Sequence, residues 1–231
     1  MKFNSCSIPG PKGDNQDAVL PPFEVGGWTW CAIADGVGSS ALGGVAARAS
    51  LEIVRQVNGD KPMAEVFASV QRKLSEIGSG EAAGKSIATT LSVLRVFRDK
   101  AFVGHVGDTR ISHYRSSGVM GRTKDQTEVQ KLLDDGVLTK NQAARYPRRN
   151  VLLSAMSAGR DYDLHEEEFL VQRGDRVLLT SDGFHSKLPR RRIAHISSAH
   201  PLFQDFWSAV QIALAAETLD DDASCLAVEI E

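Results

Sequence analysis

The sequence predicts an α+β fold in which antiparallel sheets are covered by helices. Several short apolar runs are joined by turns of a few residues, which is typical of antiparallel pairing. Helical segments come in groups and do not alternate strictly with these runs, which argues against a parallel α/β sheet. The length of 231 residues and the apolar fraction of 42% fit one folded domain.

In the first half of the chain, apolar spacing distinguishes strands from helices. Trp28–Ala34 is a continuous apolar run and is predicted to be a buried strand that leads into Asp35. Gly43–Val57, followed by Asn58-Gly59, and Pro62–Ile77 have apolar residues at helical spacing. The elements expected next are a loop at Glu81–Lys85, strands at Ser86–Val96, Ala101–Val106 and Ile111–Arg115, and turns at 98–100 and 116–118.

The second half begins with a helix at Thr127–Asp135, closed by Gly136. The polar and basic segment 136–150, with a break at Pro147, is expected to form a small flap-like excursion from a single domain that spans residues 1–231. The remaining predicted elements are a strand that starts at Phe169-Leu170, a turn at Gly174-Asp175, a strand at Arg176–Ser181, helices at Pro189–Ile196 and Pro201–Glu217, and a strand at Ala223–Ile230.

Bulk charge and cysteine usage exclude several classes of protein. The net charge of −2 and the pI of about 6.3 give no electrostatic reason to bind nucleic acid or an anionic membrane. The three cysteines Cys6, Cys31 and Cys225 form no CxxC pair, which favours a reduced, cytoplasmic chain. The N-terminus resembles no signal peptide, and no apolar stretch approaches the roughly 20 residues of a membrane span.

Acidic motifs are scattered along most of the chain. They are GDNQDA ending at Asp17-Ala18, ADGVG around Asp35-Gly36, VGDTR around Asp108, SDG around Asp182, and the cluster Asp220–Asp222. Each aspartate lies beside a glycine or at the end of an apolar run, a pattern typical of strand ends that direct carboxylates to one place. Several carboxylates in one place need a cation to stay ionised. The sequence therefore predicts a metal site assembled from distant segments.

The residue types also indicate which metal fits. A set of carboxylates, a backbone carbonyl and water suits Mg²⁺ or Mn²⁺ rather than Zn²⁺. None of the six histidines lies in an HxH or HExxH arrangement. Taken singly, each motif has an ordinary alternative, because Asp-Gly pairs are common in turns and an acidic run is usually a solvated surface. The prediction depends on the motifs in combination.

In order and wording, these motifs resemble those of the metal-dependent protein phosphatases of type 2C (PPM), in particular the compact bacterial form. SIATTLSV resembles the Gly-Thr-Thr strand of this family, VGDTR its Gly-Asp-Ser-Arg turn, and LTSDGF and DDDAS its last two metal motifs. The resemblance extends from Gly13 to the final strand. It implies two antiparallel sheets in a central sandwich, with helices on both sides and a site for two divalent cations at one edge.

The resemblance also implies a role for each site residue. Asp35 would bridge two Mn²⁺ or Mg²⁺ ions, and the Gly36 carbonyl would bind one of them. Asp182 would hold one ion and Asp221 the other, because Ser224 sets the register of the last motif. The remaining implied positions are Asp17 in the coordination sphere, partly through water, Asp108 with Asp182 at a third and weaker ion, and Lys12 at the substrate phosphate.

The activity implied is a serine/threonine protein phosphatase. A hydroxide that bridges the two ions would attack the phosphorus in line, without a covalent phosphoenzyme. Asp35, Asp182 and Asp221 would then be the catalytic residues. The partners expected are phosphorylated proteins, with an opposing serine/threonine kinase, and the chain is expected to be a monomer.

The chain departs from the family pattern at four places, and those at Lys12, Gln16 and Ser39-Ser40 leave a second hypothesis open. Lys12 stands where the family has a phosphate-binding Arg, and Gln16 replaces the usual Glu. Val37 occupies the position of a His found in animal members, so no general acid is assigned. Ser39-Ser40 replace a glycine-rich stretch. Lys12 is as easily an ordinary solvated lysine, and the alternative function is a catalytically weak, phosphatase-like module that binds or senses a phosphoprotein.

Overall fold

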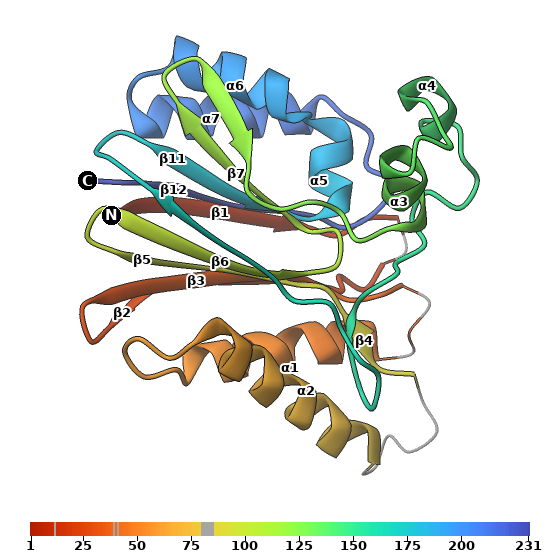
Figure 1. Cartoon of the computed structure of the whole chain (residues 1–231). Helices are drawn as coiled ribbons and strands as arrows, with labels where there is room; N and C mark the ends of the chain where they lie inside the picture. The colour runs from red at the N-terminus through yellow and green to blue at the C-terminus, as the bar shows by residue number, and fades with distance from the viewer. Residues whose placement is uncertain (12, 39, 41, 80–85) are drawn as a thin grey trace.

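The computed structural model describes residues 1–11, 13–38, 40, 42–79 and 86–231. Two five-stranded antiparallel sheets pack face to face, and helices cover the outer face of each (Figure 1). The predicted α+β sandwich is therefore confirmed. Lys12, Ser39 and the loop expected at Glu81–Lys85 lie outside the described residues.

The first sheet brings the two ends of the described chain together. Its strand order places β12 between β1 and β11, and every pairing in it is antiparallel. In spatial order the strands are β1 (Lys2–Ile8), β12 (Ala223–Glu229), β11 (Arg176–Thr180), β7 (Arg110–Arg115) and β8 (Gly118–Gly121).

The second sheet has the order β10 (His165–Leu170), β6 (Lys100–Val106), β5 (Leu91–Phe97), β3 (Trp28–Asp35) and β2 (Asp17–Val25). The short strands β4 (Ala88–Thr89) and β9 (Met156–Ser157) pair separately. Successive side chains of a strand point to opposite faces. Cys31 and Ile33 of β3 accordingly lie in the core between the sheets, whereas Trp30 and Ala32 lie in the core beneath the helices.

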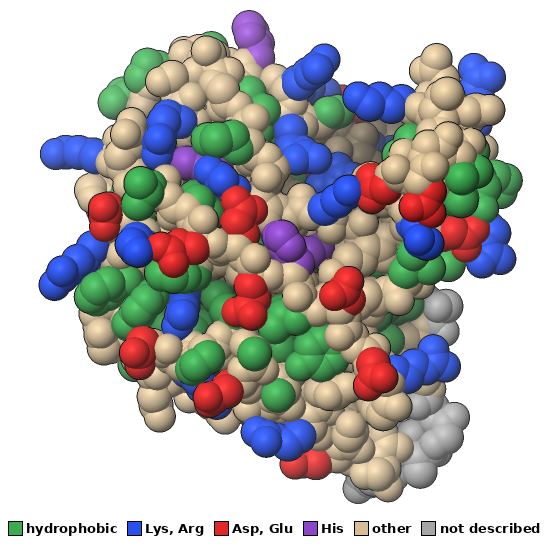
Figure 2. Space-filling model, viewed as in Figure 1, with side chains coloured by type: hydrophobic (Ala, Val, Ile, Leu, Met, Phe, Trp, Pro, Cys, Tyr) green, Lys and Arg blue, Asp and Glu red, His purple; other side chains and the backbone are tan. Residues whose placement is uncertain are grey.

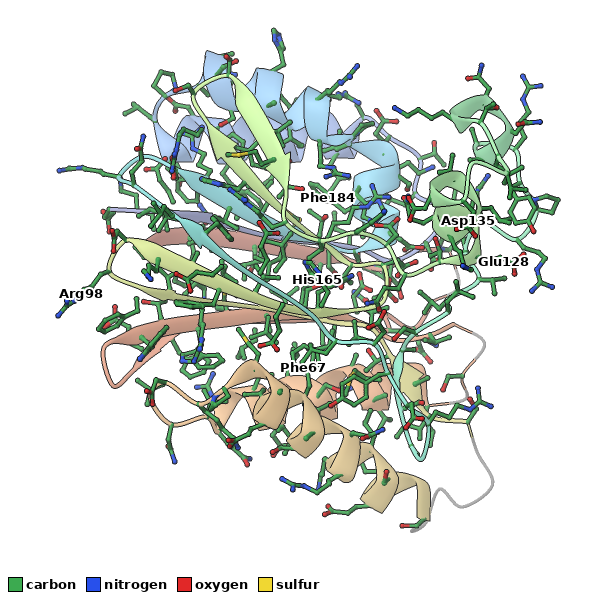
Figure 3. All side chains as sticks on the ribbon, in the orientation of Figure 1. Phe67, Arg98, Glu128, Asp135, His165 and Phe184 are labelled. Carbon is green, nitrogen blue, oxygen red and sulfur yellow. The ribbon has the colours of Figure 1, made fainter. Side chains whose placement is uncertain are left out.

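Two helical layers close the sandwich. Helices α1 (Gly43–Arg55) and α2 (Met63–Ser79) cover the second sheet, and α5 (Asp182–Lys187), α6 (Arg190–Ala199) and α7 (Phe203–Ala215) cover the first (Figure 1). Figure 3 shows Phe67 of α2 and Phe184 of α5 inside their respective layers, and both side chains are almost fully buried.

Helices α3 (Glu128–Asp134) and α4 (Lys140–Ala143) lie beside the sandwich (Figure 1). Thr127 caps α3 by accepting a hydrogen bond from the Gln130 backbone, in agreement with the helix predicted there. Thr139 and Gln142 form a capping box on α4. Residues 136–150 thus carry a short, locally stabilised helix next to α3.

Several sequence-based assignments were wrong. Strands β1 and β2 were not predicted, because β1 is a largely exposed edge strand and β2 contains Pro21-Pro22 at an irregularity between Leu20 and Phe23. The strand expected at Ser86–Val96 is broken at Thr90. Phe169-Leu170 end a strand instead of starting one, and the helix α5 that begins at Asp182 was not predicted.

A buried arginine joins the first sheet to its helices. Arg176, 4% exposed, donates from Nε to Glu229 at 2.9 Å and from Nη2 to the Pro201 carbonyl at 2.7 Å. It also donates to the carbonyls of Ser197 and His200 at the end of α6, and its guanidinium lies 4.4 Å from the ring centre of Phe206. The charge is therefore neutralised, and its hydrogen bonds satisfy carbonyls at the end of a helix.

We expect Arg176→Met to lower the free energy of unfolding by about 3–5 kcal/mol, because the mutation removes the buried partner of Glu229, which keeps only the half-exposed Lys2 at 3.3 Å, and leaves the helix-end carbonyls without their donor. Chemical denaturation measures this loss. Arg173→Met, an exposed arginine three residues earlier, is the control and should change little. Equal stability of the two variants would contradict a stabilising role for the Arg176 network.

Candidate metal-binding active site

The five predicted carboxylates lie at strand ends on the edge of the sandwich nearest α3 (Figure 1). In chain order, Asp17 opens β2, Asp35 closes β3, Asp108 lies in the turn between β6 and β7, Asp182 opens α5 directly after β11, and Asp221 lies in the turn before β12. Segments from both sheets therefore supply the site, which explains the wide spacing of the motifs in the sequence.

Asp35 is the centre of this group. It lies directly opposite Asp17 in the antiparallel pairing of β2 and β3. Burial has the largest effect on Asp35 and raises its pKa well above the usual value. Four neighbouring carboxylates raise this pKa further, in the order of effect Asp17, Asp182, Asp108 and Asp221. The structure thus brings together all five predicted acidic residues within electrostatic reach of one side chain.

The pKa values of two more of these carboxyl groups are also raised. Burial raises the pKa of Asp17 to about 7, against hydrogen bonds from Ser224 and Ser181 that lower it. The Ser181 hydroxyl donates to Asp17 Oδ2 at 2.7 Å, while Oδ1 is buried and has no hydrogen-bond partner among the described residues. Burial, with Asp182 and Asp125, raises the pKa of Asp108 to about 8. A nearby cation would stabilise the ionised form of each group.

The break in the strand at Thr90 positions Asp35. The Asp35 N–H donates to Thr90 Oγ1 at 3.0 Å, and the Asp35 carbonyl accepts from Thr90 N at 2.8 Å and from Thr89 Oγ1 at 2.9 Å. The Gly36 N–H donates to the Gln16 carbonyl at 3.1 Å. A Cβ on Gly36 would lie 2.3 Å from the carbonyl carbon of Gly43, so only glycine fits between β3 and the start of α1.

These residues surround a cavity of about 430 Å³. Asp35, Gly36, Asp108, Asp182 and Asp221 line it, and Asp14, Gln16, Asn150 and Asp222 also contribute. In the described part of the chain, no three histidine, cysteine, aspartate or glutamate side chains form a ready-made cage for an ion. The carboxylates line an open cavity, and Mg²⁺-type ions usually keep several water ligands in such sites.

The donor set therefore fits a divalent cation. All candidate donors are oxygens, and the raised pKa values and the unpartnered Asp17 Oδ1 indicate uncompensated negative charge. Sequence reasoning missed Asp14 and Thr90 and gave Asp222 no role. Asp14 lies within the GDNQDA motif and could have been considered, but only the fold shows Thr90 against Asp35.

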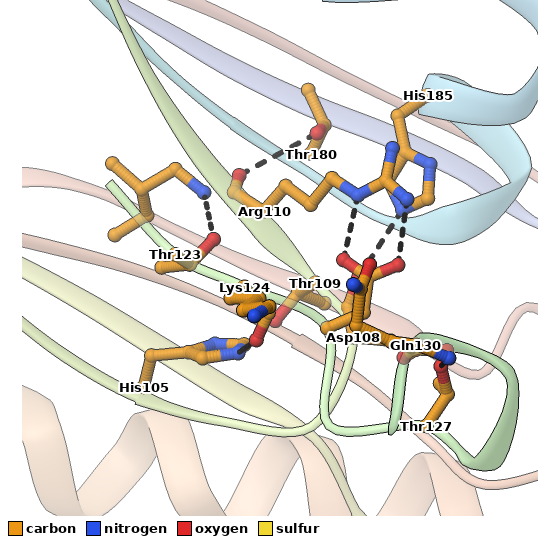
Figure 4. A network of polar contacts seen from close by, with 12 residues as sticks. His105, Asp108, Thr109, Arg110, Thr123, Lys124, Thr127, Gln130, Thr180 and His185 are labelled. Atoms are coloured by element: carbon orange, nitrogen blue, oxygen red, sulfur yellow. Dashed lines mark hydrogen bonds and ion pairs between the residues drawn. The ribbon is translucent and has the colours of Figure 1, made fainter. Parts of the chain in front are cut away.

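The turn that carries Asp108 is held by a polar network (Figure 4). Arg110 donates to both Asp125 carboxylate oxygens, at 2.7 and 2.6 Å. His185 of α5 donates from Nε2 to the Asp108 carbonyl at 3.2 Å, and burial, followed by the charge of Arg110, lowers its pKa to about 3. A neutral His185 thus connects the Asp108 turn to the helix that Asp182 opens.

A second hollow of about 690 Å³ adjoins the cavity and shares Asp108, Asp182, Asp221 and Asn150 with it. Lys and Arg side chains gather around it between α5 and α3 (Figure 2). Arg149 lines this hollow, whereas the preceding Arg148 pairs with Glu128 of α3 at 2.7 Å. The residue predicted to contact phosphate, Lys12, lies outside the described residues.

Comparison with known proteins identifies the family. The sequence profile of "Protein phosphatase 2C" matches residues 12–221. The chain belongs to the protein phosphatase 2C family. The resemblance of the motifs is therefore confirmed, and the chain is a protein phosphatase, a hydrolase of phosphoester bonds.

Bacterial members of the protein phosphatase 2C family align over most of the chain. Protein phosphatase PhpP of Streptococcus pneumoniae is 27% identical over 219 residues, which cover 90% of this chain and 89% of that protein. Serine/threonine protein phosphatase PstP of Mycobacterium tuberculosis is 29% identical over 184 residues, 74% of this chain but 34% of PstP.

Solved structures agree on the fold. The serine/threonine phosphatase of S. agalactiae has a TM-score of 0.87 at 22% identity and covers 100% of this chain and 99% of that one. The PstP catalytic domain in complex with two manganese ions has a TM-score of 0.78 at 23% identity, over 99% and 97% of the two chains. Across the described residues, no helix has the length and apolar character needed to cross a membrane.

We expect the metal-free protein to lose stability as the pH rises from about 5 to about 8. The reason is that Asp17 and Asp108, whose pKa values are raised, hold protons in the folded state that the unfolded chain has already released. Saturating Mn²⁺ should flatten this dependence. Asp35→Asn should raise the thermal midpoint of the metal-free protein at about pH 8, by removing one of the opposed charges, and should reduce stabilisation by Mn²⁺.

Thermal unfolding with and without chelator measures both effects. Glu52→Gln, the same carboxyl-to-amide change on the exposed side of α1, is the control and should behave like wild type. If the stability of the metal-free protein rose with pH over this range, the clustered carboxylates would not destabilise the folded state, and the prediction would be wrong.

Proposed function

We propose that this protein is a serine/threonine phosphatase that uses two divalent cations, Mn²⁺ or Mg²⁺, with a third and weaker cation beside Asp108 and Asp182. The observation that carries the proposal is that four of the predicted carboxylates, from distant segments, line one cavity, and that the fifth, Asp17, lies directly opposite Asp35. The similarity to PhpP and PstP supports phosphoserine and phosphothreonine in proteins as substrates.

Each candidate ligand has its own position in the proposed site. Asp35 would bridge the two ions, with the Gly36 carbonyl, Asp182 and Asp221 completing the protein's share of the ligands. Asp17 would lie behind these direct ligands, where its carboxylate accepts a hydrogen bond from Ser181. When bound, such cations lower the pKa of water and neutralise charge on the phosphoryl oxygens.

The chain itself supplies position and charge. The two strands that carry Asp17 and Asp35 are fixed in register, so these carboxylates need little movement when substrate binds. Asn150 lies at both the cavity and the adjoining hollow, where a peptide would leave the phosphate site. Lys12 would add a point charge toward the phosphate, without the bidentate geometry of an Arg.

The surroundings of the site fit a protein substrate. The open hollow beside the cavity can take peptide residues that flank a phosphorylated side chain. We propose a single domain over residues 1–231, with residues 136–150 as a flap beside this hollow, acting as a monomer in the cytoplasm against a serine/threonine kinase. The catalytically weak binding module is the alternative; the buried and unpartnered Gln16 Oε1, where the family has Glu, is the feature that favours it.

We expect the purified protein to hydrolyse phosphoserine and phosphothreonine peptides only with Mn²⁺ or Mg²⁺, and chelator to stop the reaction reversibly. Asp35→Asn should lower kcat/KM by about a hundredfold or more, because the predicted bridging ligand loses its charge. Phosphate release measures turnover. Near-wild-type activity of Asp35→Asn would refute the site, whereas phosphopeptide binding without turnover would favour the binding module.

Arg149→Ala should raise KM for a phosphopeptide by about threefold to tenfold, the effect of an exposed charge contact, and leave KM for a small aryl phosphate unchanged. The reason is that only the peptide reaches the hollow. Arg145→Ala is the matched control, since Arg145 lines a separate shallow groove with Tyr146 and Pro147. Equal effects of Arg149→Ala on both substrates would place the peptide elsewhere.

A further inference from the structure

Asp222 lies next to a predicted metal ligand, but its carboxylate is engaged by the opposite end of the chain. Oδ1 accepts the Gly10 N–H at 2.7 Å, and Oδ2 accepts the Gln16 N–H at 2.8 Å. The side chain is 7% exposed. Two short hydrogen bonds to a buried carboxylate are strong contacts, since the charge of the acceptor strengthens both.

Two glycines pack against the backbone on either side of Asp222. A Cβ on Gly10 would lie 2.5 Å from the carbonyl carbon of Asp221, and a Cβ on Gly183 would lie 2.1 Å from the carbonyl oxygen of Asp222. The peptide before Asp222 therefore lies in close contact with Gly10, and the peptide after it lies in close contact with Gly183 at the start of α5. No side chain fits at either glycine without moving the backbone.

The loop that Asp222 holds faces the catalytic cavity. Asp14 and Gln16 line that cavity, and the Gln16 carbonyl accepts the Gly36 N–H at 3.1 Å. One carboxylate thus connects the turn of Asp221, the loop residues Gly10 and Gln16 and, through Gln16, the backbone of Gly36. These are three of the segments that the proposed site needs in fixed relation.

We propose that Asp222 is a positioning residue that fastens the N-terminal loop to the Asp221 turn, so that the cation ligands and the loop facing the substrate form one rigid unit. This inference rests on the proposed function. Asp222 acts through Gly10 and Gln16, not by binding a cation. An asparagine in its place could accept only one of the two N–H groups, because its amide nitrogen is a donor.

The decisive variant is Asp222→Asn, which keeps the size and removes one acceptor. The Gln16 or Gly10 amide that loses its acceptor should exchange with solvent about tenfold faster or more, as expected on losing a hydrogen bond to a charged group. KM for a phosphopeptide and the dissociation constant for Mn²⁺ should each rise by about tenfold, while kcat changes by about twofold or less.

Asp205→Asn is the matched control. Asp205 is an exposed carboxylate on the outer helix α7 and lines neither the cavity nor the adjoining hollow, and this variant should match wild type in amide exchange, KM and Mn²⁺ affinity. Amide exchange followed by NMR, calorimetric Mn²⁺ titration and steady-state kinetics supply the three readouts. A fall in kcat with unchanged KM and Mn²⁺ affinity would overturn the proposal, because it would indicate a direct role in the reaction.

Two of these readouts are independent of the proposed activity. If the wild-type protein hydrolysed no phosphopeptide, the proposed function would fail, while amide exchange and Mn²⁺ affinity would still test Asp222. If Asp222→Asn did not fold, exchange in the wild-type protein would decide. Unprotected Gly10 and Gln16 amides in the Mn²⁺-loaded wild type would refute the proposal, and protection of both would support it.

Discussion

The site depends on the fact that the fold holds Asp17 and Asp35 directly opposite each other. Adjacent antiparallel strands hold these two carboxylates directly across from each other at a largely buried edge of the sheet. Like charges in that position destabilise a sheet, and burial increases the effect because water no longer screens them. The pairing persists because the surrounding strands fix it, and the two helical layers keep those strands in place. The fold thus stores an electrostatic conflict that a cation relieves, which is a common arrangement at functional sites.

Small residues let the other segments approach this pair. Gly36, Gly10 and Gly183 each stand where a Cβ would collide with the backbone of a neighbouring segment. The Asp-Gly motifs are therefore packing motifs as well as proposed ligand motifs. An Asp-Gly step gives a carboxylate its place and, in the next residue, permits the close backbone contact that keeps it there.

The features that could be predicted from the sequence depend on the local spacing of apolar residues and on the residue pattern of the motifs. The α+β class, helices α1, α2, α3 and α7, and the gathering of the five aspartates all followed from them. The edge strands β1 and β2 could not be predicted, because an exposed edge lacks the apolar pattern and Pro21-Pro22 interrupt the second. The sequence also could not assign the separate contacts of Asp221 and Asp222, since these depend on which backbone groups the fold brings within reach from about 200 residues away.

The strand order of the first sheet has a consequence for how the protein is made. β12 lies between β1 and β11 and is the neighbour that β1 pairs with, so β1 stays unpaired in the growing chain until residues 223–229 have been synthesised. Such long-range pairing is slow to form and leaves an exposed strand edge in the meantime. The turn of Asp221 joins the other carboxylates at the same late step. In a nascent chain the proposed catalytic edge is therefore incomplete, and on this assignment the ability to remove phosphate arises only when the sheet closes.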